Sequence, residues 1–314
     1  MGSPTTSSPE PQAILTPLTE ASIFLTFVVE PGAEDAVRDV LADVSGLKRS
    51  VGFRLPEGAL TCVVGVGAAV WDRLFGTPRP AGLHEFRALD GDHHAPSTPG
   101  DLHVHLRARR LDMCFELAQL LTTRLRGHAR IVDEVHGFRF FDERDLLGFV
   151  DGTENPDGAA AARAVLVGDE DPGFAGGSYV VTQKYLHDMA GWNALSTEEQ
   201  ENAIGRTKLQ DIEMPEDRKP PDSHIALNVI EDDKGQQLQI LRFNMPFGHV
   251  GTDEYGTYFV GYAHDPAVIE KMLENMFLGT ADAHHDRILD FSTATTGNLY
   301  FVPTADFLDD PPSP

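Results

Sequence analysis

The segment 148–156, Gly-Phe-Val-Asp-Gly-Thr-Glu-Asn-Pro, combines residue types that could carry chemistry. Its carboxylate Asp151 stands between an apolar run and a turn signature, with Gly148 three residues before it and Gly152 directly after it. Glycines in these positions allow a backbone to approach a flat ligand closely or to adopt positive φ. The same pattern is also typical of a plain turn in which an aspartate caps the backbone. Composition alone leaves both interpretations open.

The thirteen histidines offer further candidates, as metal ligands. His103 and His105 alternate in an expected strand, so their side chains share one face and could chelate a metal. No third ligand is evident nearby, and solvated strand histidines are common. Two adjacent pairs, 93–94 and 284–285, lie in loop-like contexts. Because adjacent side chains diverge in direction, at most one histidine of each pair could serve a site.

Composition argues against several classes of function. The net charge of −24, without a Lys/Arg-rich run, repels phosphate backbones, so we expect no nucleic-acid partner. The two cysteines, Cys62 and Cys114, lie in apolar stretches outside any C-x-x-C or Cys/His cluster. This argues against a disulfide framework, zinc and iron–sulfur clusters. No basic residue precedes Arg38 and no apolar run approaches membrane-spanning length, so we expect a cytoplasmic protein without a membrane partner.

Several segments together resemble a known family. Segment 148–156 resembles the G-x-x-D-G signature of dye-decolourising peroxidases, with its frequent Thr-Glu-Asn-Pro continuation. Segment 221–227, Pro-Asp-Ser-His-Ile-Ala-Leu, resembles the proximal-histidine segment of that family, and 241–248, Leu-Arg-Phe-Asn-Met-Pro-Phe-Gly, its distal arginine strand. Segments 255–262 and 277–279 are similar to further landmarks. G-x-x-D-G alone is a weak signal, but these segments in this order are specific, and the bacterial B-type subgroup is the most similar.

The resemblance implies one haem b per chain, bound noncovalently in the second half with its iron on His224. The chain has no C-x-x-C-H motif for covalent attachment. The second ring nitrogen of His224 needs an acceptor that fixes the tautomer. Asp286 is the candidate, with Asp290 less favoured, and a loop-capping role is the alternative for Asp286.

Three more residues are expected to contact the haem: Gly152, Thr153 and Arg206. The arginine is expected to pair with a propionate, and a plain surface arginine is the alternative interpretation.

The implied activity is that of a haem peroxidase. It would reduce H₂O₂ through an oxyferryl intermediate and oxidise dyes, phenols or other one-electron donors. Asp151 would move a proton between the peroxide oxygens, and Arg242 would stabilise the developing negative charge. Asn244, two residues along the strand, shares a face with Arg242 and would orient water or peroxide. The sequence does not decide whether Asp151 or Arg242 dominates cleavage.

Two alternatives remain open. A haem-handling protein without significant peroxidase turnover would use the same His224, and a ferredoxin-like scaffold would bind no haem. The expected partners of the peroxidase are hydrogen peroxide and small reductants. We also expect a homo-oligomer, because the family commonly forms them. Any enclosing shell is not legible in the sequence.

Hydrophobic periodicity predicts the elements that must position these residues. In the first half, strands are expected over 23–29, 60–66, 102–106 and 135–141, and helices over 34–47, 70–75 and 111–125. In the second half, strands are expected over 178–184, 238–243, 258–262, 288–291 and 299–302, and helices from Ser196 and from Pro266 to Phe277.

With the short helix over 70–75 set aside, and with 288–291 and 299–302 together closing the chain, each half has the order β-α-β-β-α-β. The predicted fold is α+β, with two ferredoxin-like halves whose antiparallel sheets carry helices on one face. The halves are expected over 21–150 and 151–308, the second binding the haem. Residues 1–20 and 309–314 are rich in Pro, Ser, Thr or Asp and are expected to be disordered tails.

Overall fold

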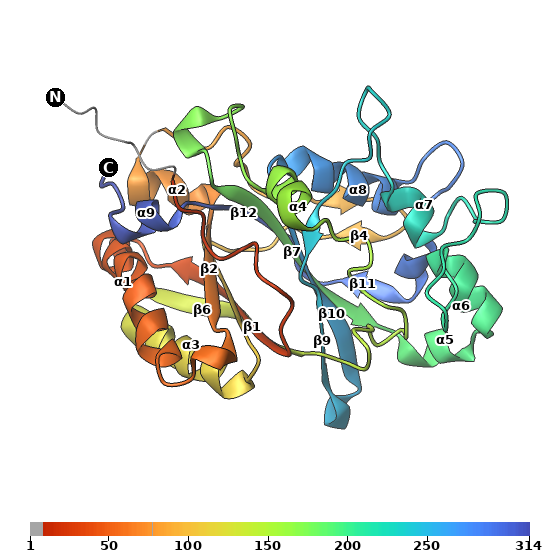
Figure 1. Ribbon diagram of the computed structural model, residues 1–314, viewed down its shortest axis with the longest axis horizontal. Coiled ribbons are helices and arrows are strands. Elements are labelled where there is room, and N and C mark those ends of the chain that lie inside the picture. Colours follow the sequence, from red (N-terminus) through yellow and green to blue (C-terminus); the bar gives the residue numbers. More distant parts are fainter. Residues whose placement is uncertain (1–8, 77) are drawn as a thin grey trace.

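The computed structural model describes residues 9–76 and 78–314, and its main feature is one long antiparallel sheet (Figure 1). The first half contributes β1 (Ala21–Val29), β2 (Thr61–Gly67), β5 (Leu102–Ala108) and β6 (Ala129–Phe138). The second half contributes β7 (Ser178–His187), β8 (Leu241–Arg242), β9 (Met245–His249), β10 (Glu254–Ala263), β11 (Ser292–Ala294) and β12 (Asn298–Val302). A separate small hairpin consists of β3 (Leu89–Asp90) and β4 (His94–Ala95).

The two halves repeat one topology. The sheet runs β6-β1-β5-β2-β12-β7-β10-β8, with antiparallel neighbours throughout. When the main strands of each half are numbered in chain order, both halves read 4-1-3-2, which is the ferredoxin-like order. The halves join where Phe301 of β12 pairs with Val66 of β2. The predicted fold class is therefore confirmed.

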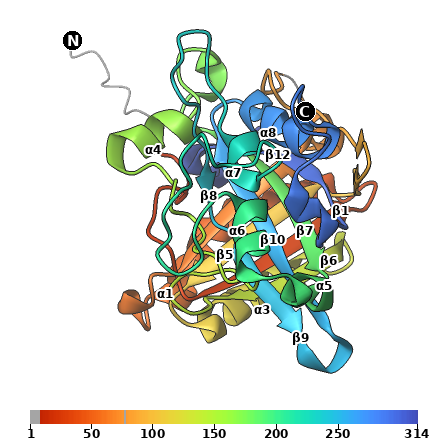
Figure 2. The same cartoon turned by 90° about the vertical axis from the view of Figure 1, so that its right-hand side faces the viewer.

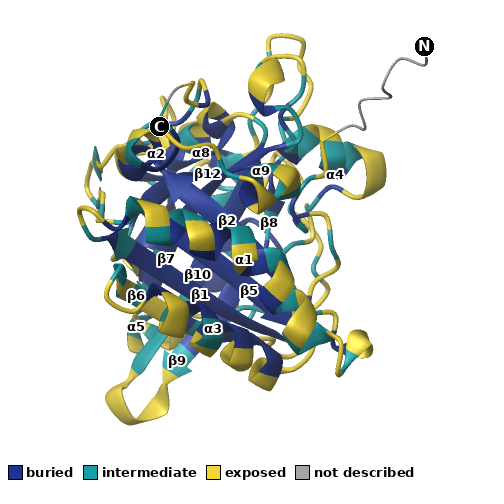
Figure 3. Cartoon of the chain, turned by 90° about the vertical axis from the view of Figure 1, so that its left-hand side faces the viewer, coloured by how far each residue is buried: buried dark blue, intermediate teal, exposed yellow. Residues whose placement is uncertain are grey.

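Helices cover one face of the sheet. The larger ones are α1 (Glu34–Gly52), α2 (Ala68–Phe75), α3 (Leu111–Leu125) and α8 (Pro266–Leu278). Ile23, Leu25 and Phe27 of β1 belong to the core on this side, as the alternation of a strand requires. Figure 3 shows these buried strands behind α1 and α3, whose outer surfaces are exposed.

On the other face the two halves of the sheet pack against each other. Phe24 of β1 stacks on Tyr258 of β10 with ring centroids 4.2 Å apart. His103 and His105 lie in this interior, and the hydroxyl groups of Tyr262 and Ser22 lie within hydrogen-bonding distance of His105. Burial lowers the pKa of His103 to about 3, so its ring is neutral. Within residues 9–76 and 78–314, neither histidine joins a group that could hold a metal.

The smaller helices gather mostly in the second half, around the site described below. They are α4 (Gly158–Val165), α5 (Met189–Ala194), α6 (Thr197–Ile204), α7 (His224–Asn228) and, near the C-terminus, α9 (Ala305–Asp309). Figure 2 faces this half, where α6, α7 and α8 lie around β10. No helix in the described part of the chain is both long and apolar enough to cross a membrane.

Three strand predictions were wrong in detail, and one of them, the strand expected over 135–141, lies earlier in the chain as β6. Residues 288–291 were expected as a strand, but Arg287–Asp290 forms a 3₁₀ helix, η4, and the strand β11 follows it. The cause is Asp286, whose Oδ1 accepts the N–H of Ile288 at 3.0 Å and so caps a helical turn. The strand expected over 238–243 is also shorter than predicted: β8 covers only Leu241–Arg242.

The expected N-terminal tail is shorter than predicted. Residues 1–8 lie outside the described part, but Ile14 is fully buried. The amide of Gln12 accepts the N–H of Val64 at 2.8 Å and donates to its carbonyl at 2.9 Å, as a neighbouring strand would. Composition could not reveal this docking. At the other end, α9 stops at Asp309 and residues 310–314 form no helix or strand.

Candidate active site

A large pocket opens in the second half beside β7, β10, α7 and α8. It encloses about 1470 Å³ of space between atoms, a volume that includes open solvent at its mouth. Most of its wall is apolar. The apolar lining includes Ile204, Ile225, Val229, Leu238, Ile240, Phe259, Ile269, Met272, Leu273 and Met276. A pocket of this size and character suits a large, flat, apolar ligand.

His224 lines one side of the pocket and is held from behind. It is the first residue of α7, and its Nδ1 lies 2.7 Å from Oδ2 of Asp286, which is fully buried. A carboxylate can only accept, so Nδ1 is the donor of this contact, and Nε2 is the ring nitrogen left for a ligand. The two oxygens of Asp286 therefore act separately, since Oδ1 caps η4 while Oδ2 holds His224. The capping and histidine-binding interpretations of Asp286 both hold.

A second histidine in the pocket wall, His187, has both ring nitrogens in hydrogen bonds. The Nδ1 of His187 lies 2.9 Å from the hydroxyl of Ser292, and its Nε2 lies 3.0 Å from that of Thr257. Desolvation lowers the pKa of His187 to about 4, so the ring stays neutral. Among the described residues that line the pocket, His224 is thus the histidine with a ring nitrogen left for a ligand.

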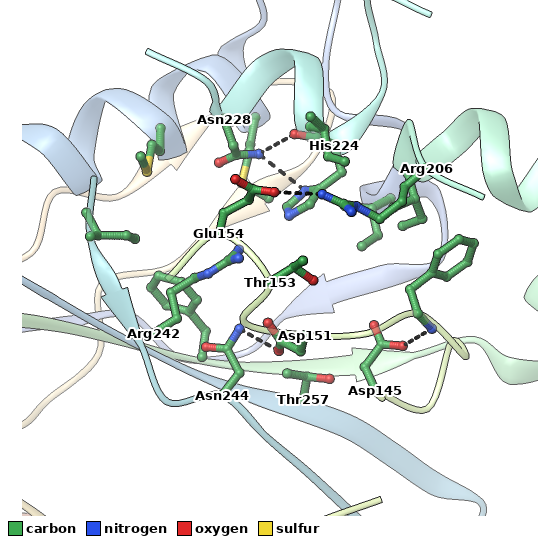
Figure 4. A pocket seen from close by; sticks show the side chains of 18 of the residues that line it. Asp145, Asp151, Thr153, Glu154, Arg206, His224, Asn228, Arg242, Asn244 and Thr257 are labelled. Carbon is green, nitrogen blue, oxygen red and sulfur yellow. Dashed lines mark hydrogen bonds and ion pairs between the residues drawn. The ribbon is translucent and has the colours of Figure 1, made fainter. Parts of the chain in front are cut away.

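Across the pocket from His224 lie Asp151 and Asn244 (Figure 4). The Oδ1 of Asn244 accepts the N–H of Val260 at 3.1 Å, which fixes the orientation of its amide. Its Nδ2 then donates to Oδ2 of Asp151 at 2.9 Å. Asn244 lies in the gap between β8 and β9, where its side-chain oxygen accepts the β10 N–H that a backbone carbonyl would otherwise accept. Its amide nitrogen at the same time holds the Asp151 carboxylate.

Arg242 stands beside this pair, and among the described residues its hydrogen bonds are made by its backbone and not by its guanidinium. Its backbone, in contrast, is firmly held. The amide of Asn155 accepts the N–H of Arg242 at 3.0 Å and donates to its carbonyl at 2.8 Å. The side chain is only partly buried, so its charge can be solvated from the pocket and remains available to a ligand. This arrangement favours a ligand that becomes negatively charged near Arg242.

The other expected haem contacts are placed differently. The Arg206 side chain lies in the pocket wall, 8% exposed, and donates to Glu154 at 2.7 Å and to the carbonyl of Asp211 at 2.7 Å. It is therefore not a plain surface arginine. Thr153 also lines the pocket and donates to Asp211 at 3.3 Å. Gly152, with φ of +81°, lines a smaller neighbouring hollow instead, together with Asp151, Arg242 and Asn244.

Sequence reasoning missed three polar residues of the site. Asn155 was part of the quoted motif but had no assigned role. Asn228 donates to the carbonyl of His224 at 2.7 Å, and its spacing of four residues in a helix could have indicated that contact. Burial raises the pKa of the Asp145 carboxyl to about 7, and the nearby Asp151 charge also raises it. No local pattern marks Asp145. Its carboxyl is mostly protonated below that pH, which limits the negative charge around Asp151.

The residues present fit a haem. The pocket is wide and apolar, which suits a porphyrin. His224 offers a free Nε2 whose partner nitrogen is fixed by a carboxylate, as in protein sites that bind metals through histidine. On the opposite side, Asp151 and Arg242 place a proton acceptor next to a permanent cation.

The comparisons with known proteins agree along the whole chain. Residues 11–139 match the family model described as Dyp-type peroxidase, N-terminal, and residues 142–307 match Dyp-type peroxidase, C-terminal. A dye-decolorizing peroxidase of Rhodococcus erythropolis is 65% identical over 96% of this chain and 89% of its own length.

Solved structures give the same result. The encapsulated DyP-type peroxidase of Mycobacterium smegmatis superposes with a TM-score of 0.96 at 60% identity, covering 97% of this chain and 99% of that one. DyPB of Rhodococcus jostii superposes with a TM-score of 0.94 at 56% identity, covering 97% and 99%. Since both halves match family models and the relatives match over nearly their full length, the chain belongs to the Dyp-type peroxidase family and is a haem peroxidase.

Proposed function

We propose that the chain binds one haem b noncovalently, with the iron on Nε2 of His224, and uses it to reduce H₂O₂ and oxidise one-electron donors such as dyes or phenols. The free Nε2 of His224, opposite Asp151 and Arg242, is the observation that carries this proposal. A variant of the Rhodococcus jostii relative described in complex with heme supports the choice of cofactor. When bound, the haem supplies the electrons that reduce the peroxide and accepts electrons from the donor.

Asp151 is the proposed proton carrier. Its carboxylate accepts the proton from one oxygen of H₂O₂ and returns it to the other oxygen, which leaves as water. The hydrogen bond from Asn244 keeps this carboxylate turned toward the pocket. We therefore assign Asn244 a positioning role in addition to any contact with water or peroxide.

Arg242 is the proposed electrostatic partner of that step. As the O–O bond breaks, negative charge grows on the departing oxygen, and a permanently charged guanidinium stabilises it. Because Asn155 clamps both backbone polar groups of Arg242, the strand that carries this side chain cannot shift freely. The clamp thus fixes the backbone from which the guanidinium reaches the pocket, and a charge positioned before the reaction is the condition for electrostatic catalysis.

The haem contacts are assigned to the second half, residues 151–308. The guanidinium of Arg206 has five N–H donors, and Glu154 and Asp211 use only part of them, so a propionate can bind alongside. Thr153 lines the same wall, and Gly152 provides the turn next to Asp151.

The partners proposed beyond hydrogen peroxide and small reductants follow the family. We infer a cytoplasmic homo-oligomer. The encapsulated relative from Mycobacterium smegmatis supports association of this chain with an enclosing shell.

A spectroscopic experiment tests the proposal. The purified protein should show a Soret band and should oxidise a dye only when H₂O₂ is added. Acidified butanone should then extract the haem completely, since nothing links it covalently. A Soret band without dye oxidation at any peroxide concentration would instead indicate a haem-handling protein, and haem that stays with the protein after extraction would contradict noncovalent binding.

Asp286→Asn should raise the Fe(III)/Fe(II) potential of the bound haem by tens of millivolts. A carboxylate on Nδ1 gives the imidazole anionic character, which favours Fe(III), and asparagine keeps the shape but removes the charge. Its single acceptor oxygen can serve either His224 or the cap on η4, but not both. For one electron, about 59 mV corresponds to a factor of ten in the equilibrium constant. Spectroelectrochemical titration measures the shift.

Asp290→Asn is the matched control, because Asp290 lies on the same turn but contacts His285, His93 and Arg287 instead of His224. Its curve should overlay that of the wild type. If the Asp286→Asn curve also overlays it, Asp286 does not tune the iron.

A further inference from the structure

We propose a second metal site in this protein, formed by His93, His285 and Asp290, which takes a divalent transition-metal cation such as Zn²⁺. The three residues lie outside the wall of the haem pocket. His93 lies in the turn of the β3–β4 hairpin, while His285 and Asp290 lie on either side of Asp286 in and around η4. One possible ligand atom from each residue lies within 4.8 Å of the others.

The donor atoms are already close to metal-binding separations. The Nε2 of His93 is 3.3 Å from Oδ1 of Asp290, and the Nε2 of His285 is 3.0 Å from the same oxygen. Zn–N and Zn–O bonds of about 2.0–2.2 Å in a tetrahedron place neighbouring donor atoms roughly 3.3–3.5 Å apart. Both histidine nitrogens are thus near such a separation from Oδ1 of Asp290, and all three donor atoms lie within 4.8 Å of one another. Binding requires the two rings to close around the ion, and it leaves the fourth position to water. Two imidazoles and one carboxylate are the ligand set of a first-row transition metal, not of Mg²⁺ or Ca²⁺.

The polar atoms that face away from the proposed metal have carboxylate or guanidinium groups nearby. The second oxygen of Asp290 contacts Nε of Arg287 at 3.1 Å, which leaves Oδ1 for the cation. The Nδ1 of His285 is buried without a hydrogen-bond partner, and Oδ2 of the exposed Asp92 lies 3.4 Å from it. When His285 binds a metal through Nε2, Asp92 is the carboxylate near enough to accept the N–H at Nδ1 and so raise the basicity of the ligand.

Each of the two histidine pairs in the sequence, 93–94 and 284–285, contributes one residue to the cluster. In the first pair, the ring of His94 contacts Asp90 instead, at 2.6 Å. The site would tie a hairpin of the first half to η4 of the second half, directly beside the residue that holds His224. Its expected role is to stabilise this junction.

Calorimetric titration of the haem-loaded, chelator-treated full chain with Zn²⁺ tests the site, with excess Mg²⁺ present to occupy carboxylate-only sites. We expect one Zn²⁺ per chain. Changing a carboxylate behind a ligand typically weakens binding by about 10–100-fold, which is the effect expected for Asp92→Asn. His93→Asn removes a ligand itself and should weaken binding by at least about 100-fold.

His94→Asn, in the same hairpin, is the matched control and should bind Zn²⁺ like the wild type. Zinc should also raise the melting temperature of the wild type and His94→Asn but not of His93→Asn, because only a ligand that binds the folded state stabilises it. The Soret spectrum checks that each variant keeps its haem and its fold. The proposal is wrong if the wild type binds no zinc, or if His93→Asn binds it with unchanged affinity.

Discussion

Arg242→Leu should slow the reaction of the haem-loaded protein with hydrogen peroxide by about 100-fold or more. Removing a donor that stabilises developing charge typically costs about 3 kcal/mol of activation free energy, and each 1.4 kcal/mol is about a factor of ten in rate. Arg242 should reach this magnitude because, among the described residues, only its backbone is hydrogen-bonded and its guanidinium has no competing partner. Stopped-flow recording of the Soret band against peroxide concentration gives the second-order rate constant.

Two further variants make this measurement decisive. Arg242→Lys keeps the charge but loses the planar fork, so its rate should fall between those of the wild type and Arg242→Leu. Arg126→Leu removes an exposed arginine after α3 in the first half and should leave the rate unchanged. A wild-type rate for Arg242→Leu would show that this side chain does not assist O–O cleavage. Asp151→Ala, measured in the same way, shows whether loss of the proton carrier Asp151 or loss of the Arg242 charge slows the reaction more.

The sequence was sufficient for the strand and helix order because that order depends on local periodicity. The β-branched and aromatic run of β1 predicted a strand, and the apolar face of α1 predicted the residues that this helix buries. The sequence was not sufficient to predict how the two halves join. The pairing of β12 with β2 depends on which sheet edges meet, and no local pattern encodes that choice. The same holds for Gln12, whose amide reaches a strand edge from a Pro-rich segment.

Some residues of the site could likewise be predicted from the sequence, and others could not. His224 and Arg242 stand in segments with recognisable neighbours, and a histidine ligand needs an acceptor, so Asp286 could be sought by its chemistry. Asn155 reaches the backbone of Arg242 across 87 residues of sequence, and this clamp is visible only in three dimensions. The strand wrongly expected over 288–291 has a related cause, because the capping hydrogen bond of Asp286 outweighed the strand propensity of an apolar run.

His224→Ala should lose most of the haem, and with it most of the peroxidase activity. No other histidine that lines the described pocket has a free ring nitrogen, since both nitrogens of His187 lie on hydroxyl groups. The ratio of Soret to protein absorbance measures haem content, and dye oxidation measures turnover. Added imidazole should restore part of both, because it fits the space that the missing ring leaves.

The control is His187→Gln, which changes the other pocket histidine and should keep the haem. The loss in His224→Ala also has a second origin, since Asp286 is fully buried and would be left without its partner. Leaving a buried charge unpaired costs about 3–5 kcal/mol, so the variant should melt at a lower temperature than the haem-free wild type. His224→Ala combined with Asp286→Asn removes that charge and should recover most of the melting temperature without recovering the haem. If His224→Ala instead retains full haem and normal turnover, the iron is bound by a histidine outside this wall, and the proton and charge roles of Asp151 and Arg242 must be reassigned with it.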